Sequence, residues 1–485
     1  MARRAAAIAR GVTLQVAARV TGLPLSIVSL GIATRYLGTQ GYGVLTAAVA
    51  FVGLFDTFTD LGIGTTVIRR VAGKEQSSLE RLTSVNMGFS ALFAIPLTVL
   101  VALAGLLAYD GRATAQFAVL MLSVGLLFDT VSSCVQPVFD VHVRYSAVAG
   151  AEFVSRLLTL AASLTVMFTD AGLLAMCAVQ VLPQLVRVVV LLFAARKYIP
   201  VRMVVAGREI VSLLRESLPF AAIGLIAVIY WRADAVLLSW LAPAAQVAAY
   251  GVAMQLAFNL AVIPQVFSRS AMSTINETFA TDRSRFRGAV DQGYRFLLLC
   301  SVPIAVLGIP LSARIITFVG SAEYTASTTP VLQWFFVACA LSFVTSIVSN
   351  ALIAGHEQRF LTRLSIANLL ANIALNLVLI PLFGAVGTGI ALTITELSGV
   401  VFTQPRLLRI GAAPVPLGYL VRLLPGLAAA LLAMWATWRL PLIVPLLAAG
   451  IAYLVGAWAG GAIPQPMRAT MVQALRPGKK ATTPA

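Results

Sequence analysis

Runs of about twenty apolar residues recur along almost the whole chain, and they restrict its fold more than any other feature. One helix of about 20 apolar residues is long enough to cross the hydrocarbon core of a bilayer. Fourteen such helices are predicted, over residues 11–34, 42–67, 84–108, 116–138, 146–168, 172–195, 218–241, 246–267, 295–319, 328–353, 361–381, 386–404, 418–438 and 441–463. Only 11% of the 485 residues are charged, whereas a soluble domain carries about 25%. The sequence therefore predicts an all-α, polytopic membrane protein.

The basic residues indicate how these helices are oriented. Of the 35 lysines and arginines, 27 fall on the side of the N-terminus if successive helices alternate in direction. Cytoplasmic loops of membrane proteins carry this excess of basic residues. We therefore expect cytoplasmic N- and C-termini. Topology explains the formal charge of +17, so no nucleic-acid partner is expected.

A short motif suggests that the chain contains two copies of one unit. Tyr42-Gly43-Val44 opens the second predicted helix, and Tyr250-Gly251-Val252 opens the eighth. Parallel six-helix copies of this kind hold the substrate site between them. We predict two six-helix bundles around a central cavity, followed by an extra helix pair. The expected divisions are 1–197 for the N-terminal bundle, 198–217 for a cytoplasmic linker, 218–410 for the C-terminal bundle, 411–465 for the transmembrane hairpin and 466–485 for a basic cytoplasmic tail. A second cytoplasmic loop is expected at 268–294, either solvated or lying on the membrane surface as a basic amphipathic segment.

Five stretches of this chain resemble one family of membrane proteins. They are Thr34–Val44, Asp60–Gly64, Ile68–Arg70, Arg232-x-Asp234 and Phe383–Gly387. Together they resemble the bacterial polysaccharide (O-antigen-type) flippases of the multidrug/oligosaccharidyl-lipid/polysaccharide (MOP) exporter superfamily. The resemblance covers the first twelve predicted helices, nearly all of the chain before about residue 410.

The resemblance implies a transporter of the bacterial inner membrane that works by alternating access. It would flip undecaprenyl-diphosphate-linked oligosaccharide from the cytoplasmic to the outer leaflet for O-antigen, lipopolysaccharide or exopolysaccharide biosynthesis. The implied partners are this lipid-linked oligosaccharide, membrane lipids, and a polysaccharide polymerase or co-polymerase. The predicted final hairpin departs from a twelve-helix plan, which keeps a lipid II flippase as an alternative.

Four arginines lie within predicted helices and are candidates to bind the diphosphate: Arg19, Arg156, Arg187 and Arg232. A charged side chain at the bilayer centre costs at least about 2.5–3.5 kcal/mol, so it normally faces a protein interior or a watery cavity. The planar guanidinium matches phosphate oxygens and keeps its charge when desolvated. Arg19 and Arg232 are favoured because they occupy the first helices of the two copies. For Arg232 the alternatives are a structural ion pair with Asp234 and a side chain that reaches toward the lipid headgroups. For Arg156 and Arg187 the alternative is a packing pair with acids such as Glu152 or Asp129.

Four carboxylates could form ion pairs or couple transport to protons or cations. Asp56 and Asp60 lie one helical turn apart, so a continuous helix would present them on one face. A salt bridge between Asp60 and Arg19 is one interpretation. Ion coupling is the other, with Asp234 and Glu396 as further candidates.

Three asparagines form a polar stripe on the eleventh predicted helix. Asn368, Asn372 and Asn376 recur every four residues and therefore share one face. Contact with the sugars of the cargo and hydrogen bonding between helices explain the stripe equally well.

Other function classes fit the sequence less well. No cofactor or metal is expected, because the two histidines are far apart and the four cysteines lack CxxC spacing. An enzyme would need a sizeable loop or a cluster of acidic and basic groups, and none is predicted. A multidrug exporter of the same fold is the stronger alternative, although cationic drugs should prefer an acidic cavity to one with several arginines.

Overall fold

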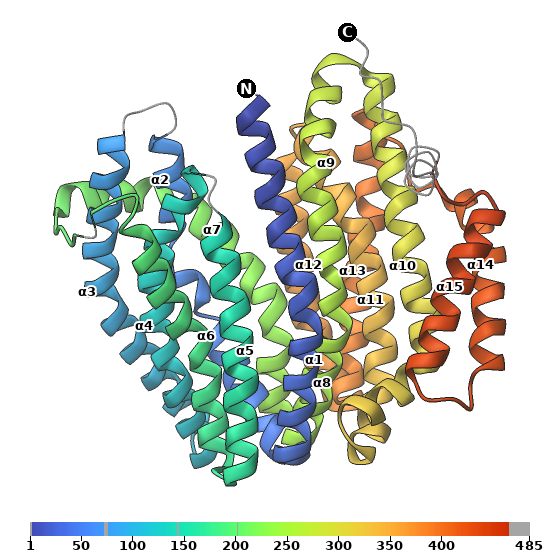
Figure 1. Cartoon of the computed structure of the whole chain (residues 1–485), viewed down its shortest axis with the longest axis horizontal. Coiled ribbons are helices and arrows are strands. Elements are labelled where there is room, and N and C mark those ends of the chain that lie inside the picture. The colour runs from blue at the N-terminus through green and yellow to red at the C-terminus, as the bar shows by residue number, and fades with distance from the viewer. Residues whose placement is uncertain (1, 72–75, 143–144, 201, 465–485) are drawn as a thin grey trace. The chain divides into compact units, whose positions relative to one another are not determined.

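The computed structural model describes residues 2–71, 76–142, 145–200 and 202–464, with side chains except at 2–20, 145–146 and 269. Every regular element of these residues is a helix, which confirms the predicted all-α class (Figure 1). The helices are α1 (Ala2–Gly53), η1 (Asp56–Thr59), α2 (Ile63–Val71), α3 (Gln76–Ala108), α4 (Ala113–Val141), α5 (Tyr145–Thr169), α6 (Gly172–Ala195), α7 (Gly207–Leu241), α8 (Ala244–Phe258), η2 (Asn259–Ala261), α9 (Val262–Thr281), α10 (Arg283–Val319), α11 (Ala322–Ala354), α12 (Gln358–Phe383), α13 (Ala385–Arg409), α14 (Leu417–Ala436) and α15 (Ile443–Ala459).

Many of these helices have the length and composition of membrane spans. Within the described part of the chain, eleven helical segments are long and apolar enough to cross a bilayer, with α8 and α9 counted as one. The last apolar helix, α15, has only 17 residues. Large apolar side chains such as Leu432, Trp435 and Ile451 are exposed on α14 and α15, as expected for surfaces that face lipid. The chain is therefore a multi-pass membrane protein.

The first predicted span and the start of the second form one kinked helix. Inside α1, Gly38 has φ 61° and ψ −174°, a conformation that is essentially open only to glycine. The Tyr324 hydroxyl donates to the Gly38 carbonyl at 2.7 Å, and Arg35 Nε donates to the Gly320 carbonyl at 2.6 Å. These bonds hold the turn where α1 changes direction.

The second predicted span, 42–67, is interrupted near its middle. Helix α1 ends at Gly53, η1 covers Asp56–Thr59, and α2 begins only at Ile63. Leu61 and Gly62 both have left-handed backbones, with φ 51° and 71°, so one helix cannot run through them. A break within a membrane-spanning segment frees backbone and side-chain polar groups, and in transporters such breaks border substrate or ion sites.

The predicted cytoplasmic loop at 268–294 is wrong. Helix α9 continues to Thr281 and α10 begins at Arg283, so only Asp282 separates them. The backbone N–H groups of Arg285 and Ser284 donate to the Asp282 carboxylate at 3.2 and 2.8 Å. Asp282 thus caps the start of α10, and these hydrogen bonds lower the pKa of its carboxylate below the usual value. The polar residues of this segment belong to the end of α9 and the start of α10, and their composition resembles that of a loop.

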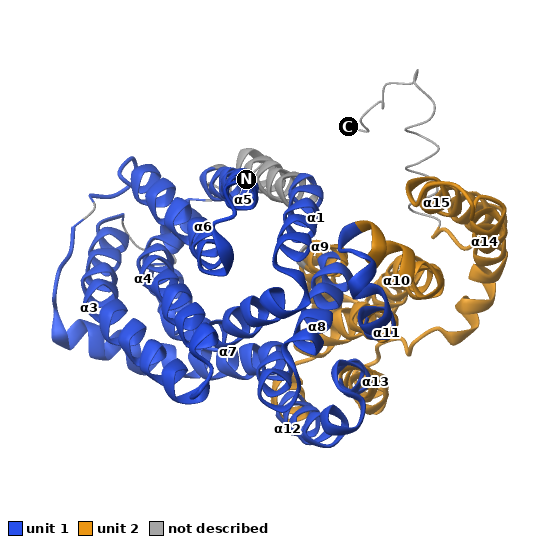
Figure 2. Ribbon diagram, turned by 90° about the horizontal axis from the view of Figure 1, so that it is seen from below, with its two compact units in different colours: residues 1–259, 319–331, 365–391 blue, residues 260–318, 332–364, 392–485 orange. Residues whose placement is uncertain are grey.

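The helices group into two compact units (Figure 2). Unit 1 comprises residues 1–259, 319–331 and 365–391, and unit 2 comprises 260–318, 332–364 and 392–485. Helix α7 begins at Gly207, within the segment 198–217 expected as a linker. In unit 2, the Tyr453 hydroxyl donates to the Leu299 carbonyl at 2.7 Å and ties α15 to α10. The division into bundles at 197 and 218 stays a prediction.

The repeated Tyr-Gly-Val motif marks the contact between α1 and α8 in unit 1. A Cβ on Gly43 would lie 1.9 Å from the Ala244 carbonyl oxygen, and one on Gly251 would lie 2.6 Å from Thr46. Both motifs therefore place a glycine where the two helices approach most closely. The neighbouring tyrosines, Tyr42 and Tyr250, are buried beside this contact.

Candidate functional site

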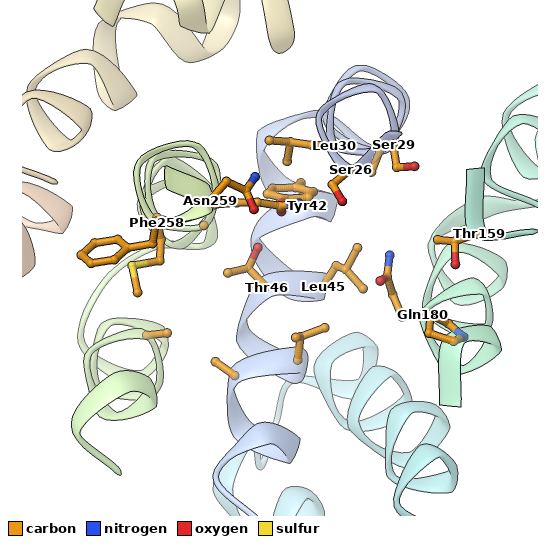
Figure 3. Close-up of a pocket in the computed structure, with 18 of the residues that line it drawn as sticks. Ser26, Ser29, Leu30, Tyr42, Leu45, Thr46, Thr159, Gln180, Phe258 and Asn259 are labelled. Atoms are coloured by element: carbon orange, nitrogen blue, oxygen red, sulfur yellow. The ribbon is translucent and has the colours of Figure 1, made fainter. Parts of the chain in front are cut away.

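A cavity of about 750 Å³ lies within unit 1, between α1, α5, α6, α7 and α8. One wall is rich in hydroxyl and amide groups and includes Ser26, Ser29, Thr159 and Gln180. Figure 3 shows Thr159 and Gln180 on the side opposite Phe258, with α1 between them. Aromatic side chains, among them Trp231, Tyr250 and Phe258, line the other wall. The cavity therefore combines polar and apolar surfaces, as a site for an amphipathic ligand requires.

Arg232 lies on the wall of this cavity. Its Nη2 atom is 3.9 Å from Asp56 Oδ2, and the two side chains are 40% and 48% exposed. A Cβ on Gly53 would lie 2.9 Å from Arg232 Nε, so the end of α1 leaves room for the guanidinium. The break after Gly53 brings Asp56 to Arg232. This loose, exposed ion pair leaves the guanidinium able to bind an anion.

Asp234 does not pair with Arg232, so the alternative of a structural ion pair between them is wrong. Residues two apart on a helix point in different directions. Asp234 is only 2% exposed, and its Oδ1 accepts a hydrogen bond of 2.9 Å from Asn376 Nδ2. Among the described residues, no salt bridge involves Asp234.

The asparagine stripe serves a contact between helices. Asn372 and Asn376 are fully buried, and Asn376 Nδ2 also donates to Asn372 Oδ1 at 3.0 Å. Neither side chain lines the cavity. Their burial against Asp234 agrees with interhelical hydrogen bonding and argues against the alternative, contact with sugars. Asn368, further along the stripe, is partly buried.

Arg156 also lies on the cavity wall, which sequence reasoning did not favour. Its Nη2 contacts Glu152 Oε1 at 2.8 Å, and its Nη1 donates to Ser26 Oγ at 3.0 Å. The anticipated pairing with Glu152 is present, but both members line the cavity. Serines and threonines at helical spacing on α5 are the signal that could have identified this wall. Ser155 and Thr159 follow Glu152 on the same face.

The remaining candidates lie elsewhere. Arg187 Nη2 donates to Gln136 Oε1 at 3.4 Å and does not line the cavity. Asp60 Oδ1 accepts from the Gly64 backbone N–H at 3.0 Å and so caps the start of α2. Glu396 is in unit 2, where its Oε2 accepts from Thr345 Oγ1 at 3.0 Å. The side chain of Arg19 lies outside the described residues.

Comparison with known proteins gives the fold and the family. The family profile "Polysaccharide biosynthesis protein" matches residues 8–275, and the profile "MatE" matches residues 219–378. Over 389 residues the chain is 21% identical to a candidate O-antigen transporter of Shigella flexneri, a match that covers 76% of this chain and 90% of that protein.

Solved structures of two transporters have the same fold. The lipid II flippase MurJ in an inward closed conformation matches with a TM-score of 0.77 and 15% identity, covering 92% of this chain and 98% of that one. A MATE-family multidrug transporter of the MOP superfamily in an inward-facing conformation matches with a TM-score of 0.68 and 14% identity, covering 81% and 98%. At such low identity the structural likeness concerns the fold alone.

The family profile extends over more than half of the chain, and its matched region contains the residues that line the cavity. The fold found by structural comparison is that of MOP transporters. This chain therefore belongs to the polysaccharide biosynthesis protein family.

Proposed function

We propose that this protein flips an undecaprenyl-diphosphate-linked oligosaccharide from the cytoplasmic to the outer leaflet of the bacterial inner membrane by alternating access. The proposal is supported by membership of the polysaccharide biosynthesis family and by the similarity to a candidate O-antigen transporter. The observation that carries it is the exposure of Arg232 on the wall of a large cavity, within a chain built to cross the bilayer. A membrane protein tolerates such a charge where it serves transport. The proposed role needs no catalytic residue and no cofactor.

Arg232 is the proposed contact for the diphosphate. Its guanidinium offers several N–H donors in a fixed plane, which suits two neighbouring phosphate groups. Without cargo, the Asp56 carboxylate, 3.9 Å away, partly neutralises this charge. A phosphate oxygen of the cargo could readily take the place of this carboxylate. Arg19 remains a proposed second contact. It stands two helical turns before Ser26, a residue on the cavity wall.

The charge of the cavity favours this cargo over cationic drugs. Its described lining contains two arginines, Arg156 and Arg232, and one acid, Glu152. A cationic drug would gain little attraction from a lining with a net positive charge. Lipid II carries the same lipid-diphosphate chemistry, and the lipid II flippase MurJ matches 92% of this chain in structure. A lipid II flippase is therefore the second candidate.

Transport in proteoliposomes tests the role of Arg232. A charge-assisted hydrogen bond contributes about 1.5–3 kcal/mol, so Arg232→Ala should slow flipping of the lipid-linked oligosaccharide roughly 10- to 100-fold at limiting cargo. Arg232→Lys should be intermediate, because it keeps the charge but loses the planar fork. Arg187→Ala is the matched control, since Arg187 lies in a membrane helix away from the cavity wall.

Two results would count against the proposal. One is an Arg232→Ala protein that inserts at normal levels and flips at the wild-type rate. The other is a wild-type protein that moves cationic dyes but no lipid diphosphate, which would favour drug export. If lipid II is flipped faster than an oligosaccharide-linked lipid, the second candidate replaces the first.

A further inference from the structure

We propose that Glu152 and Arg156 form a carbohydrate subsite on the cavity wall, which binds hydroxyl groups of the sugars next to the diphosphate. The inference rests on the proposed function, because it assigns two parts of the proposed cargo to two sites on the cavity wall. Arg232 would hold the charged diphosphate. The ion pair on α5 would hold the neutral sugars.

The pair is exposed to the cavity and is firmly oriented. The side chains of Glu152 and Arg156 are 36% and 27% exposed, and both line the cavity. Arg156 donates to Ser26 Oγ at 3.0 Å, and the Ser26 hydroxyl donates in turn to the Gly22 carbonyl at 3.1 Å. This chain of bonds fixes the guanidinium between α5 and α1. A side chain held in this way binds a ligand at a smaller entropic cost.

Helix α1 is shaped to admit this guanidinium. A Cβ on Gly22 would lie 2.5 Å from Arg156 Nη1 and 2.8 Å from its Cδ. Any larger residue at position 22 would therefore displace the arginine from its place. A pair that served only to neutralise two charges would not need this space on the neighbouring helix.

The charge balance of the pair suits a sugar better than a phosphate. Arg156 is neutralised by a carboxylate at 2.8 Å, whereas Arg232 has its carboxylate at 3.9 Å. An anion on Arg156 would also meet the negative charge of Glu152. A sugar hydroxyl is both a donor and an acceptor, so one hydroxyl can donate to Glu152 while its neighbour accepts from Arg156. Arg156 has five N–H donors, of which its bonds to Glu152 and Ser26 use two.

The surrounding wall extends the same chemistry. Ser29, Thr159 and Gln180 line the cavity beside the pair, and Figure 3 shows them on α1, α5 and α6. The Thr159 hydroxyl donates to the Ser155 carbonyl at 2.8 Å, which leaves its oxygen as an acceptor for a cargo hydroxyl. Across the cavity, Trp231 and Phe258 offer apolar surface for the C–H faces of a sugar ring.

Binding of two cargoes to the full-length protein tests the subsite. The cargoes are undecaprenyl diphosphate carrying an oligosaccharide and undecaprenyl diphosphate without sugar. Wild type should bind the glycosylated lipid at least about tenfold more tightly than the bare one, the gain expected from one charge-assisted hydrogen bond. Glu152→Gln is nearly isosteric and removes the carboxylate. It should lose most of this preference without weakening the bare lipid, because removing a negative charge from the cavity does not oppose diphosphate binding.

Two further variants separate binding from structure. Thr159→Val removes one hydroxyl with little change of shape, and it should weaken only the glycosylated cargo even if Glu152→Gln folds poorly. The double exchange Glu152→Arg with Arg156→Glu keeps an ion pair at the same spacing. If the pair is purely structural, this double variant should bind both lipids as the wild type does. If the pair forms the subsite, the double variant should lose the preference for the glycosylated lipid.

The failures of the two proposals are distinguishable. Equal affinity of wild type for the two lipids, or equal weakening of both cargoes by Glu152→Gln, overturns the carbohydrate subsite and leaves the flippase proposal standing. Failure of wild type to bind either lipid overturns the proposed function. Arg232→Ala, in contrast, should weaken both cargoes, because both carry the diphosphate.

Discussion

At the residue scale, Asp234 is a carboxylate buried in unit 1, only 2% exposed. A buried carboxylate with no cationic partner is normally neutral or holds a cation, because an isolated charge is very unfavourable away from water. Its described hydrogen bond comes from an amide, Asn376 Nδ2, at 2.9 Å. This arrangement fits a group that gains and loses a cation during transport. The coupling role proposed for Asp234 therefore deserves the first test among the four carboxylates.

We predict that Asp234→Asn uncouples transport from the ion gradient and leaves slow exchange of cargo. The change is nearly isosteric, and the new amide oxygen can still accept the hydrogen bond from Asn376. Flipping in proteoliposomes with an imposed pH or cation gradient measures the effect. Glu396→Gln is the comparison in unit 2, where Thr345 supplies a hydroxyl partner. Full gradient dependence in the Asp234 variant would remove this residue as the coupling group.

The sequence could identify the polar residues but not all of their partners. Arg232 was predicted at a polar site inside the membrane, and the structure places it on a cavity wall. Its partner was mistaken, because Asp234 is near in sequence but points elsewhere, while Asp56 reaches Arg232 only through a break in the preceding helix. The asparagine stripe was ambiguous because periodicity shows a shared face but not what covers it.

At the element scale, hydropathy predicted most helices but not the places where they bend or break. The periodicity of apolar residues contains no information on backbone dihedral angles. Gly38 and the pair Leu61–Gly62 adopt positive φ values, and these set the path of the chain around the cavity. Two glycines close together at 62 and 64 were the available signal for the break. The motif at 42–44 was more informative, since its glycine marks the contact between α1 and α8.

The kink at Gly38 gives a prediction of stability. Its φ of 61° and ψ of −174° are strained for any residue with a Cβ, so Gly38→Ala should destabilise the protein by about 1–3 kcal/mol. Thermal unfolding in detergent should show a lower midpoint. Gly150→Ala is the matched control, because Gly150 lies in α5 with open space around its Cα. It should be neutral or slightly stabilising. Equal effects of the two changes would contradict the argument from backbone strain.

At the scale of the whole molecule, the balance of basic residues predicts the orientation in the membrane. Of the 35 lysines and arginines, 27 are assigned to the cytoplasmic side. Helix α1 contains both the first predicted span and the start of the second. The predicted orientation is unchanged, because the kink at Gly38 still separates two chain directions. The absence of a long loop at 268–294 does not change it either, because the turn at Asp282 falls within the segment assigned to the cytoplasmic side.

Cysteine labelling in intact cells tests this orientation. Thr114 and Thr281 are both exposed at helix ends, and a cysteine is close to threonine in size. In a background lacking the four native cysteines, Thr114→Cys should react with an impermeant thiol reagent added outside, because the turn before α4 is assigned to the outer side. Thr281→Cys should react only after the membrane is permeabilised, since basic residues cluster around it. Labelling of Thr281→Cys but not Thr114→Cys in intact cells would reverse the topology, and with it the outward direction proposed for flipping.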